Sequence, residues 1–125
     1  MKRVAIIPPG TDTAKMVVAP GMRVGDLLFL SGSTGFKDGK LVGPDVESQA
    51  RQAFENQRRV LEAAGSSLDN VVKVNCHLTH PDRDLQGWNK VFKEYFPANP
   101  PARATVGGAL VREGAVVEIE IVATV

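Results

Sequence analysis

The chain has 125 residues, of which 43% are hydrophobic and 23% are charged, a composition typical of one globular domain spanning residues 1–125. Fifteen basic and fourteen acidic residues leave a formal charge of +1. This balance gives no electrostatic reason to expect nucleic acid or an anionic membrane as the main partner. The first apolar run is too short for a signal peptide and Cys76 has no second cysteine to pair with, so we expect a cytoplasmic protein.

The first third of the chain predicts short strands separated by turns. Apolar runs predict strands at Val4–Ile7, Met16–Ala19 and Asp26–Ser31, and a Pro-Gly sequence closes each of the first two. Turn-forming residues dominate the segment 32–43, and Lys37–Lys40, with Asp-Gly at its centre, is typical of a hairpin tip. This part of the chain therefore predicts β-structure.

A long amphipathic helix is predicted from Val46 to Ala64. Asp45 stands at the N-cap position and Gly65 supplies the C-terminal stop. One face is apolar at helical spacing, through Val46, Ala50, Ala53, Phe54, Val60, Leu61 and Ala64. The opposite face is most simply a solvated one and carries Arg51, Glu55, Arg58, Arg59 and Glu62.

The second half of the chain predicts a strand, a helix and two more strands. Residues 71–79 alternate, with one apolar face formed by Val72, Val74, Cys76 and Leu78, and a polar face formed by Lys73, Asn75, His77 and Thr79. A helix capped by Asp82 or Asp84 follows and ends at Pro97. Its apolar stripe consists of Leu85, Trp88, Val91, Phe92, Tyr95 and Phe96. The last strands are predicted at Arg103–Leu110 and Ala115–Val125.

This order of elements predicts an α+β sandwich with two helices on one face of a mixed sheet. The other face is then uncovered, and Val116 and Val122 are expected to share it with Glu118 and Glu120. A half-apolar open face favours a closed symmetric oligomer, so we expect association to bury it.

Arg103 and Glu118 are the first candidates for a binding site. A charge within an apolar strand is unfavourable unless it is paired or used, and the planar guanidinium of Arg103 fits a carboxylate ligand. The plainer alternative is that Glu118 and Glu120 lie on the wet face of a half-buried strand.

Several other residues have side chains suited to a binding or catalytic site, but a structural role explains them equally well. Ser31, before Gly32, is either a ligand contact at a strand end or a turn serine, and Asn89 is either a site residue or an exposed helix position. Histidine is the residue type suited to proton transfer near neutral pH, but His77 and His80 have no catalytic partner nearby in the sequence. Cys76 falls on an apolar side and is expected to be a small buried hydrophobe. No zinc spacing, phosphate-binding loop or hydrolase elbow is present.

Five segments of the chain, in this order and spacing, match one pattern. They are Val24–Gly32, Gln49–Asn56, Leu61–Val74, Pro100–Val106 and Val117–Glu120. Together they resemble the Rid family of reactive intermediate deaminases, formerly called YjgF, from about residue 24 to the end. The resemblance implies a chorismate-mutase-like α+β fold and a homotrimer with ligand clefts between subunits. It also implies hydrolysis of enamines and imines, such as 2-iminobutanoate and 2-iminopropanoate, to 2-oxo acids and ammonia, without metal or organic cofactor.

The resemblance also assigns roles by position. It implies that Arg103 binds the substrate carboxylate, that Glu118 orients the attacking water, and that Ser31 and Asn89 are the strand-end serine and helix asparagine of the site. Two positions depart from the family. Val18 stands where a tyrosine is usual and Thr105 where a cysteine is frequent, which changes the shape and hydrogen bonding around the substrate side chain.

Two other classes of function remain open at this point. One is a non-catalytic trimer that binds small carboxylates or partner proteins at the same cleft, which the departures at Val18 and Thr105 favour. The other is an endoribonuclease or translation inhibitor, a description attached to some members of the family. RNA cleavage would call for a basic stripe with aromatic residues or a histidine pair, and acidic neighbours offset the basic helix positions Arg51, Arg58 and Arg59.

Overall fold

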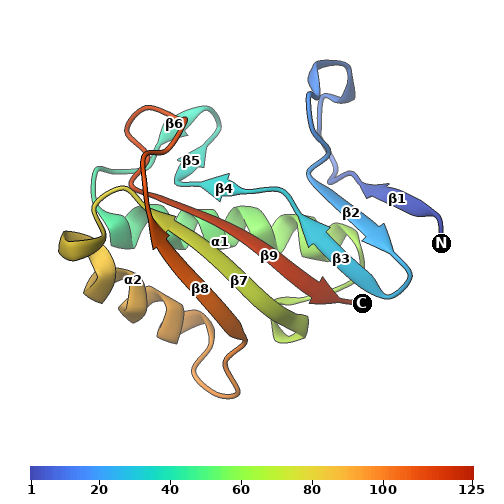
Figure 1. Cartoon of the computed structure of the whole chain (residues 1–125). Helices are drawn as coiled ribbons and strands as arrows, with labels where there is room; N and C mark the ends of the chain where they lie inside the picture. The colour runs from blue at the N-terminus through green and yellow to red at the C-terminus, as the bar shows by residue number, and fades with distance from the viewer.

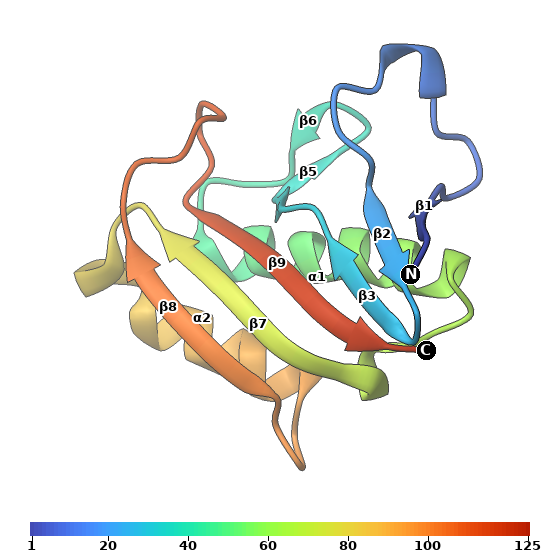
Figure 2. The same cartoon turned by 45° about the vertical axis from the view of Figure 1, so that its right-hand side comes forward.

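Two α-helices pack on one side of a mixed β-sheet in the computed structural model, which describes all 125 residues (Figures 1 and 2). The strands of the large sheet are β1 (Arg3–Ile6), β2 (Gly21–Val24), β3 (Leu27–Leu30), β4 (Ser33–Thr34), β7 (Val71–Leu78), β8 (Ala102–Gly107) and β9 (Val117–Thr124). Their order is β1-β2-β3-β9-β7-β8, with β4 also pairing with β9. Only β7 and β8 run parallel. The predicted α+β class is confirmed.

The turn chemistry of the β5–β6 hairpin is as predicted. The strands β5 (Phe36–Lys37) and β6 (Lys40–Leu41) pair antiparallel, and the two residues between them have positive φ, 51° at Asp38 and 79° at Gly39. Positive φ at both central residues is the geometry of a two-residue hairpin turn whose twist matches its strands.

The strand predicted at Met16–Ala19 is wrong. The second strand lies at Gly21–Val24, and only two residues, one of them Gly25 with φ 58°, separate it from β3. In a hairpin with a two-residue turn, the residue before the turn pairs with the residue after it. Val24 therefore pairs with Leu27, and β2 must end at Val24. Residues 16–20 form a loop after the 3-10 turn η1 (Thr13–Lys15), in which Val17 and Val18 are exposed.

The helix α1 (Val46–Ala63) begins as predicted, because the carboxylate of Asp45 accepts a hydrogen bond from the Ser48 N–H at 2.9 Å. The helix α2 (Pro81–Tyr95) begins earlier than predicted, with His80 and not Asp82 or Asp84 at the N-cap. Proline is preorganised for the first helical position, where its missing N–H is not needed. Neither helix is long and apolar enough to cross a membrane.

Two valines lie on the opposite face of the sheet from the face predicted for them. A register shift between Val71 and Lys73 in the β7–β9 pairing inserts one residue, so that Val71 is buried and Val72 is 44% exposed. Val116, predicted on the open face, is buried in the core, and its N–H donates to Gln49 Oε1 at 2.8 Å. That buried amide holds the start of β9 against α1.

An aromatic cluster joins the two helices. Phe54 of α1 is fully buried and stacks on Trp88 of α2, with ring centroids 5.7 Å apart and planes 6° apart. Tyr95 stacks on the same Phe54 ring at 4.5 Å, and Phe96 meets it edge-on at 5.7 Å. Aromatic pairs of this kind stabilise a fold beyond the contribution of the apolar area that they bury, so this cluster fixes the orientation of α2 on the sheet.

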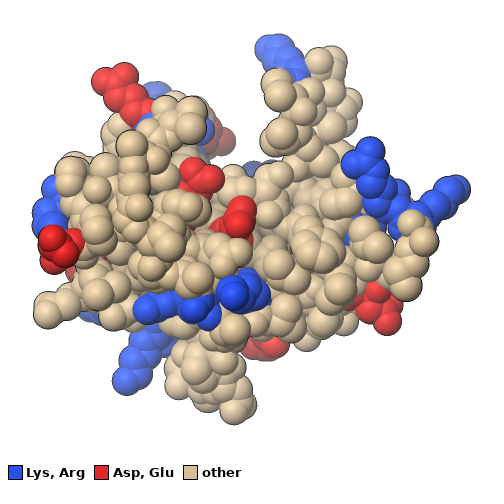
Figure 3. All heavy atoms as spheres, viewed as in Figure 1, with Lys and Arg blue, Asp and Glu red and all other residues tan.

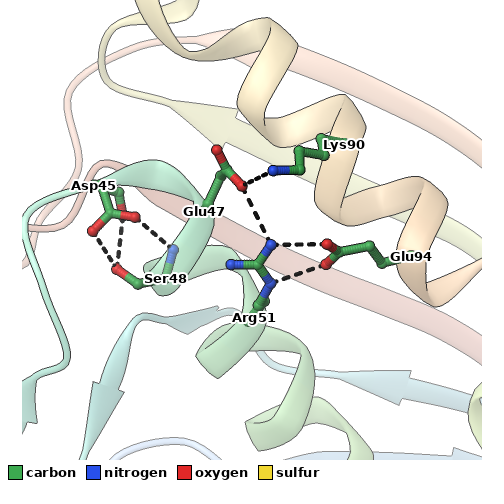
Figure 4. Close-up of polar contacts among 6 residues, drawn as sticks. All are labelled: Asp45, Glu47, Ser48, Arg51, Lys90 and Glu94. Atoms are coloured by element: carbon green, nitrogen blue, oxygen red, sulfur yellow. Dashed lines mark hydrogen bonds and ion pairs between the residues drawn. The ribbon is translucent and has the colours of Figure 1, made fainter.

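Ion pairs connect the same helices at their outer surface (Figure 4). Arg51 binds Glu94 through two hydrogen bonds of 2.8 and 2.9 Å, and Glu47 contacts both Lys90, at 3.0 Å, and Arg51, at 3.3 Å. Part of the polar face of α1, predicted to be solvated, therefore meets α2. The side chains stay partly exposed, so the pairs orient the helices more than they stabilise them.

Truncation of Phe54 tests the importance of the aromatic cluster. Phe54→Ala should lower the free energy of unfolding by about 3–5 kcal/mol, because it removes a fully buried ring and leaves a cavity. Urea denaturation followed by circular dichroism measures this change. Val17→Ala, at a position that is 97% exposed, should change stability by less than about 0.5 kcal/mol. Equal effects of the two substitutions would contradict the role given to the cluster.

Candidate functional site

Arg103 lies on β8, the strand at the edge of the sheet, with its side chain on the helix side. Its guanidinium carbon is 4.8 Å from the ring centroid of Phe92 and 5.7 Å from that of Trp88. Aromatic faces attract a cation, so α2 provides a platform that holds the half-buried arginine in place. None of the ion pairs in the chain uses Arg103, which leaves its donors available to a ligand.

Thr105 lies two residues further along the same face of β8. Its hydroxyl accepts a hydrogen bond from the indole N–H of Trp88 at 3.2 Å, so Thr105 satisfies a buried donor. Asn89 follows Trp88 on α2 and is exposed. We call Arg103, Thr105 and Asn89 the arginine half-site.

Cys76 is opposite Thr105 in the β7–β8 pairing and is buried, as predicted. Burial raises the pKa of its thiol to about 12, and the nearby charge of Arg103 offsets only part of this effect. A thiol in such surroundings is not a nucleophile at neutral pH.

Glu118 lies on β9, between Thr34 of β4 and His77 of β7. It alternates with buried residues of β9 and is itself half-buried on the open face of the sheet. Gly32 lies so close that a Cβ atom there would collide with the Glu118 carboxylate. The glycine after Ser31 therefore makes room for this acid, which is the close approach expected of a glycine at a strand end.

Ser31 and Val18 come from the segments next to Gly32. The Ser31 hydroxyl donates to the carbonyl oxygen of Ala19 at 2.6 Å, which ties the loop that carries Val18 to the end of β3. Val18 itself is 67% exposed. We call Ser31, Val18 and Glu118 the glutamate half-site.

The two half-sites do not meet within one chain. Arg103 is on the helix side of the sheet, whereas Glu118 is on the open side, which faces the viewer in Figure 3 and carries both acidic and basic groups over its strands. A site that uses both residues therefore needs two copies of the chain. Their joint role stays a prediction.

Two polar residues of this region were missed as site residues. His77 is directly opposite Glu118, and the sequence could not reveal this because strand pairing is non-local. Gln57 is fully buried on α1, and its Nε2 donates to the Ser31 carbonyl at 2.9 Å and to Ser33 Oγ at 2.7 Å. The sequence did contain a signal for this contact. A glutamine on the apolar face of a helix predicts a buried amide, and a buried amide must find hydrogen-bond partners.

The chain also has a groove of about 500 Å³ along α1 and α2. Arg51 and Arg58 line it, but Arg51 is paired with Glu94 and Arg58 with Glu55. We do not place the site there, because these charges are already used. No three His, Cys, Asp or Glu side chains converge as a metal ligand set would require.

Comparison with known proteins gives consistent matches. The family model described as Endoribonuclease L-PSP matches residues 13–125. A 2-iminobutanoate/2-iminopropanoate deaminase from Dermatophagoides farinae is 37% identical over 120 residues, covering 92% of this chain and 93% of that protein. The mitochondrial protein mmf2 of Schizosaccharomyces pombe is 42% identical over 105 residues, 82% of each chain. The crystal structure of YyfA, a Rid-family protein from Yersinia pestis, superimposes with a TM-score of 0.88 at 31% identity, covering 99% of this chain and 100% of that one.

The burial of Cys76 predicts that its thiol is unreactive in the folded protein. With a pKa raised to about 12, the thiolate is a minute fraction at pH 8. Ellman's reagent should label less than a tenth of the protein in an hour at pH 8, and all of it once urea is added. Rapid labelling of the native protein would show that the β7–β8 region opens easily.

Proposed function

The chain belongs to the Rid family, described also as the endoribonuclease L-PSP family, and from this premise we propose that it hydrolyses reactive enamines and imines. The substrates are 2-imino acids such as 2-iminobutanoate and 2-iminopropanoate, and the products are 2-oxo acids and ammonia. A relative of nearly the same length carries the name of this activity, which supports the proposal.

The observation that carries the proposal is the guanidinium of Arg103, half-buried on an aromatic platform and free of any carboxylate of its own chain. A 2-imino acid has a carboxylate next to its C=N bond. Two parallel N–H···O bonds from Arg103 would fix that carboxylate and remove most of the freedom of the reacting carbon.

Glu118 supplies the second function, activation of water. Its carboxylate, held in the gap beside Gly32, would take a proton from a water molecule that attacks the imine carbon. Ser31 already donates its hydroxyl proton to Ala19, so its oxygen is left to accept a hydrogen bond from the substrate or the water. Asn89 would donate or accept at the opposite side of the cleft. No metal or organic cofactor is part of this proposal.

Because Arg103 and Glu118 lie on opposite sides of the sheet, a joint site needs more than one copy of the chain, and the resemblance to the Rid family implies three. We therefore propose a homotrimer in which Arg103 of one copy faces Glu118 of the next. The open face of the sheet exposes large apolar side chains, among them Phe29 at 44% and Val106 at 48%. An exposed apolar surface of this kind is typical of association sites. A closed assembly would bury it and join the half-sites in the same step.

A non-catalytic carboxylate-binding trimer is the second candidate, because Thr105 is committed to the Trp88 N–H and Val18 adds no polar group. RNA cleavage finds less support. Lys73 is the only lysine or arginine on the polar face of β7, and Arg51 and Arg58 of α1 are held in ion pairs, so no basic stripe follows the sheet.

The assembly can be tested first. Size-exclusion chromatography with light scattering should give a mass near three times the 13.4 kDa of one chain at micromolar concentration. Val106→Glu, which places a charge on the exposed apolar face, should shift the mass toward the monomer without unfolding the chain. A parent protein that is monomeric would remove the proposed intersubunit site.

The central test measures release of 2-oxo acids from imines that an amino-acid oxidase generates in situ, with semicarbazide as the trap for unreacted imine. Arg103→Ala should lower kcat/KM by about 100-fold or more, because it removes two charge-assisted bonds of about 1.5–3 kcal/mol each. Arg103→Lys should restore only part of the loss, since an ammonium lacks the planar fork. Glu118→Gln should lower kcat with little effect on KM.

Arg112→Ala is the matched control, because Arg112 also stacks on an aromatic ring, that of Phe36, but lies in the β8–β9 loop. It should keep the parental rate. If Arg103→Ala retained that rate, Arg103 would be a structural residue and not the anchor. Binding of 2-oxobutanoate without any turnover would favour the non-catalytic trimer, and turnover of single-stranded RNA that follows the protein through purification would favour the nuclease.

A further inference from the structure

His77 lies directly opposite Glu118 in the antiparallel pairing of β7 with β9. Residues in such positions share one face of the sheet and have Cβ atoms about 4.5–5.5 Å apart. The imidazole is exposed and the carboxylate half-buried. At the next position on this face, Asn75 donates to Glu120 at 3.2 Å, so side chains paired across these two strands do reach each other.

The imidazole of His77 has no bonded partner in its own chain. The charged residues on the same face of the neighbouring strands are Lys73, Glu118 and Glu120. On its other side, β8 presents only alanine and valine, with Val106 opposite His77. In the β8–β9 loop, Glu113 is exposed and Arg112 lies on the ring of Phe36. The imidazole takes part in no ion pair within the chain. The acidic residue directly opposite it on the neighbouring strand is Glu118.

We propose that His77 is a second proton-transfer group of the glutamate half-site, acting together with Glu118; this rests on the proposed imine hydrolysis. Glu118 alone accepts a proton from water but leaves the imine nitrogen without a donor. Imidazole is the side chain that gives and takes protons near neutral pH, and here it is next to the base in space although 41 residues separate His77 from Glu118 in the chain.

The steps balance with these two groups alone. In the first step water forms a C–O bond to the imine carbon, its proton moves to the Glu118 carboxylate, and the C=N electron pair moves to nitrogen, which takes a proton from the His77 imidazolium. The product is a carbinolamine. In the second step the protonated Glu118 returns its proton to the amino nitrogen, and the C–N bond breaks with its electron pair on ammonia. The hydroxyl proton moves to His77, and the O–H electron pair forms the C=O bond of the 2-oxo acid. Both residues regain their starting forms.

The pH dependence of the reaction tests this role. His77→Gln keeps a polar side chain of similar size that cannot gain or lose a proton, and it should lower kcat at pH 7 by about 100-fold or more with KM unchanged. The rate of the parent should fall as pH rises through the range in which imidazole loses its proton, and this fall should be absent in His77→Gln. His80→Gln is the control, because His80 is an exposed residue at the start of α2 and should behave as the parent.

Binding of 2-oxobutanoate, measured by calorimetry at pH 6 and pH 8, separates this inference from the proposed reaction. The parent and His80→Gln should bind more tightly at pH 6, and His77→Gln should lose that difference. If the parent shows the difference but no turnover, the hydrolysis proposal fails and the place of His77 in the site stands. A His77→Gln protein with the parental kcat and pH profile would overturn the inference. RNA cleavage abolished by the same substitution would also overturn it, and would assign the pair to phosphodiester chemistry.

Discussion

The antiparallel pairing of β7 with β9 is the constraint from which the rest of the molecule follows. It alternates side chains between a helix layer and an open face, so Cys76 and Ile119 enter the core while His77 and Glu118 remain accessible. Because the side-chain period of a strand is two, a slip of one residue would bury the acid and expose the core. The Gln49 amide bonded to Val116 and the bulge at Val71 bracket the pairing at its two ends.

The helix layer prepares the arginine half-site in a different way. Phe54 fixes Trp88, and the Trp88 ring with Phe92 then supports the guanidinium of Arg103. The indole N–H of Trp88 donates a hydrogen bond to Thr105, so both side-chain packing and this hydrogen bond fix the position of β8 relative to α2. An arginine placed in this manner loses little side-chain entropy when it binds a carboxylate, which is the advantage of preorganisation.

In the proposed function, the separation of the half-sites would make chemistry dependent on association. Arg103 lies on one side of the sheet and Glu118 on the other. If they have the roles proposed for them, a lone chain could not orient a substrate carboxylate against its own water-activating group. The proposed trimer would bury the open, partly apolar face of the sheet. It would also couple the stability of the assembly to activity, since loss of the contact would remove both.

The sequence by itself determined the local features: the Asp45 cap, the Asp38-Gly39 turn, the alternation that buries Cys76, and the motifs that place the chain in its family. The cap, the turn and the alternation each depend on residues within one turn or one strand of each other, and the family motifs can be read from the order of residues alone. Tertiary structure alone decided the position of β2, the exposure of Val72, the opposite faces of Arg103 and Glu118, and the cross-strand position of His77 opposite Glu118. Each of these depends on which strand lies beside which and in what register. Such pairings join residues far apart in the chain, and short-range patterns carry no information about them.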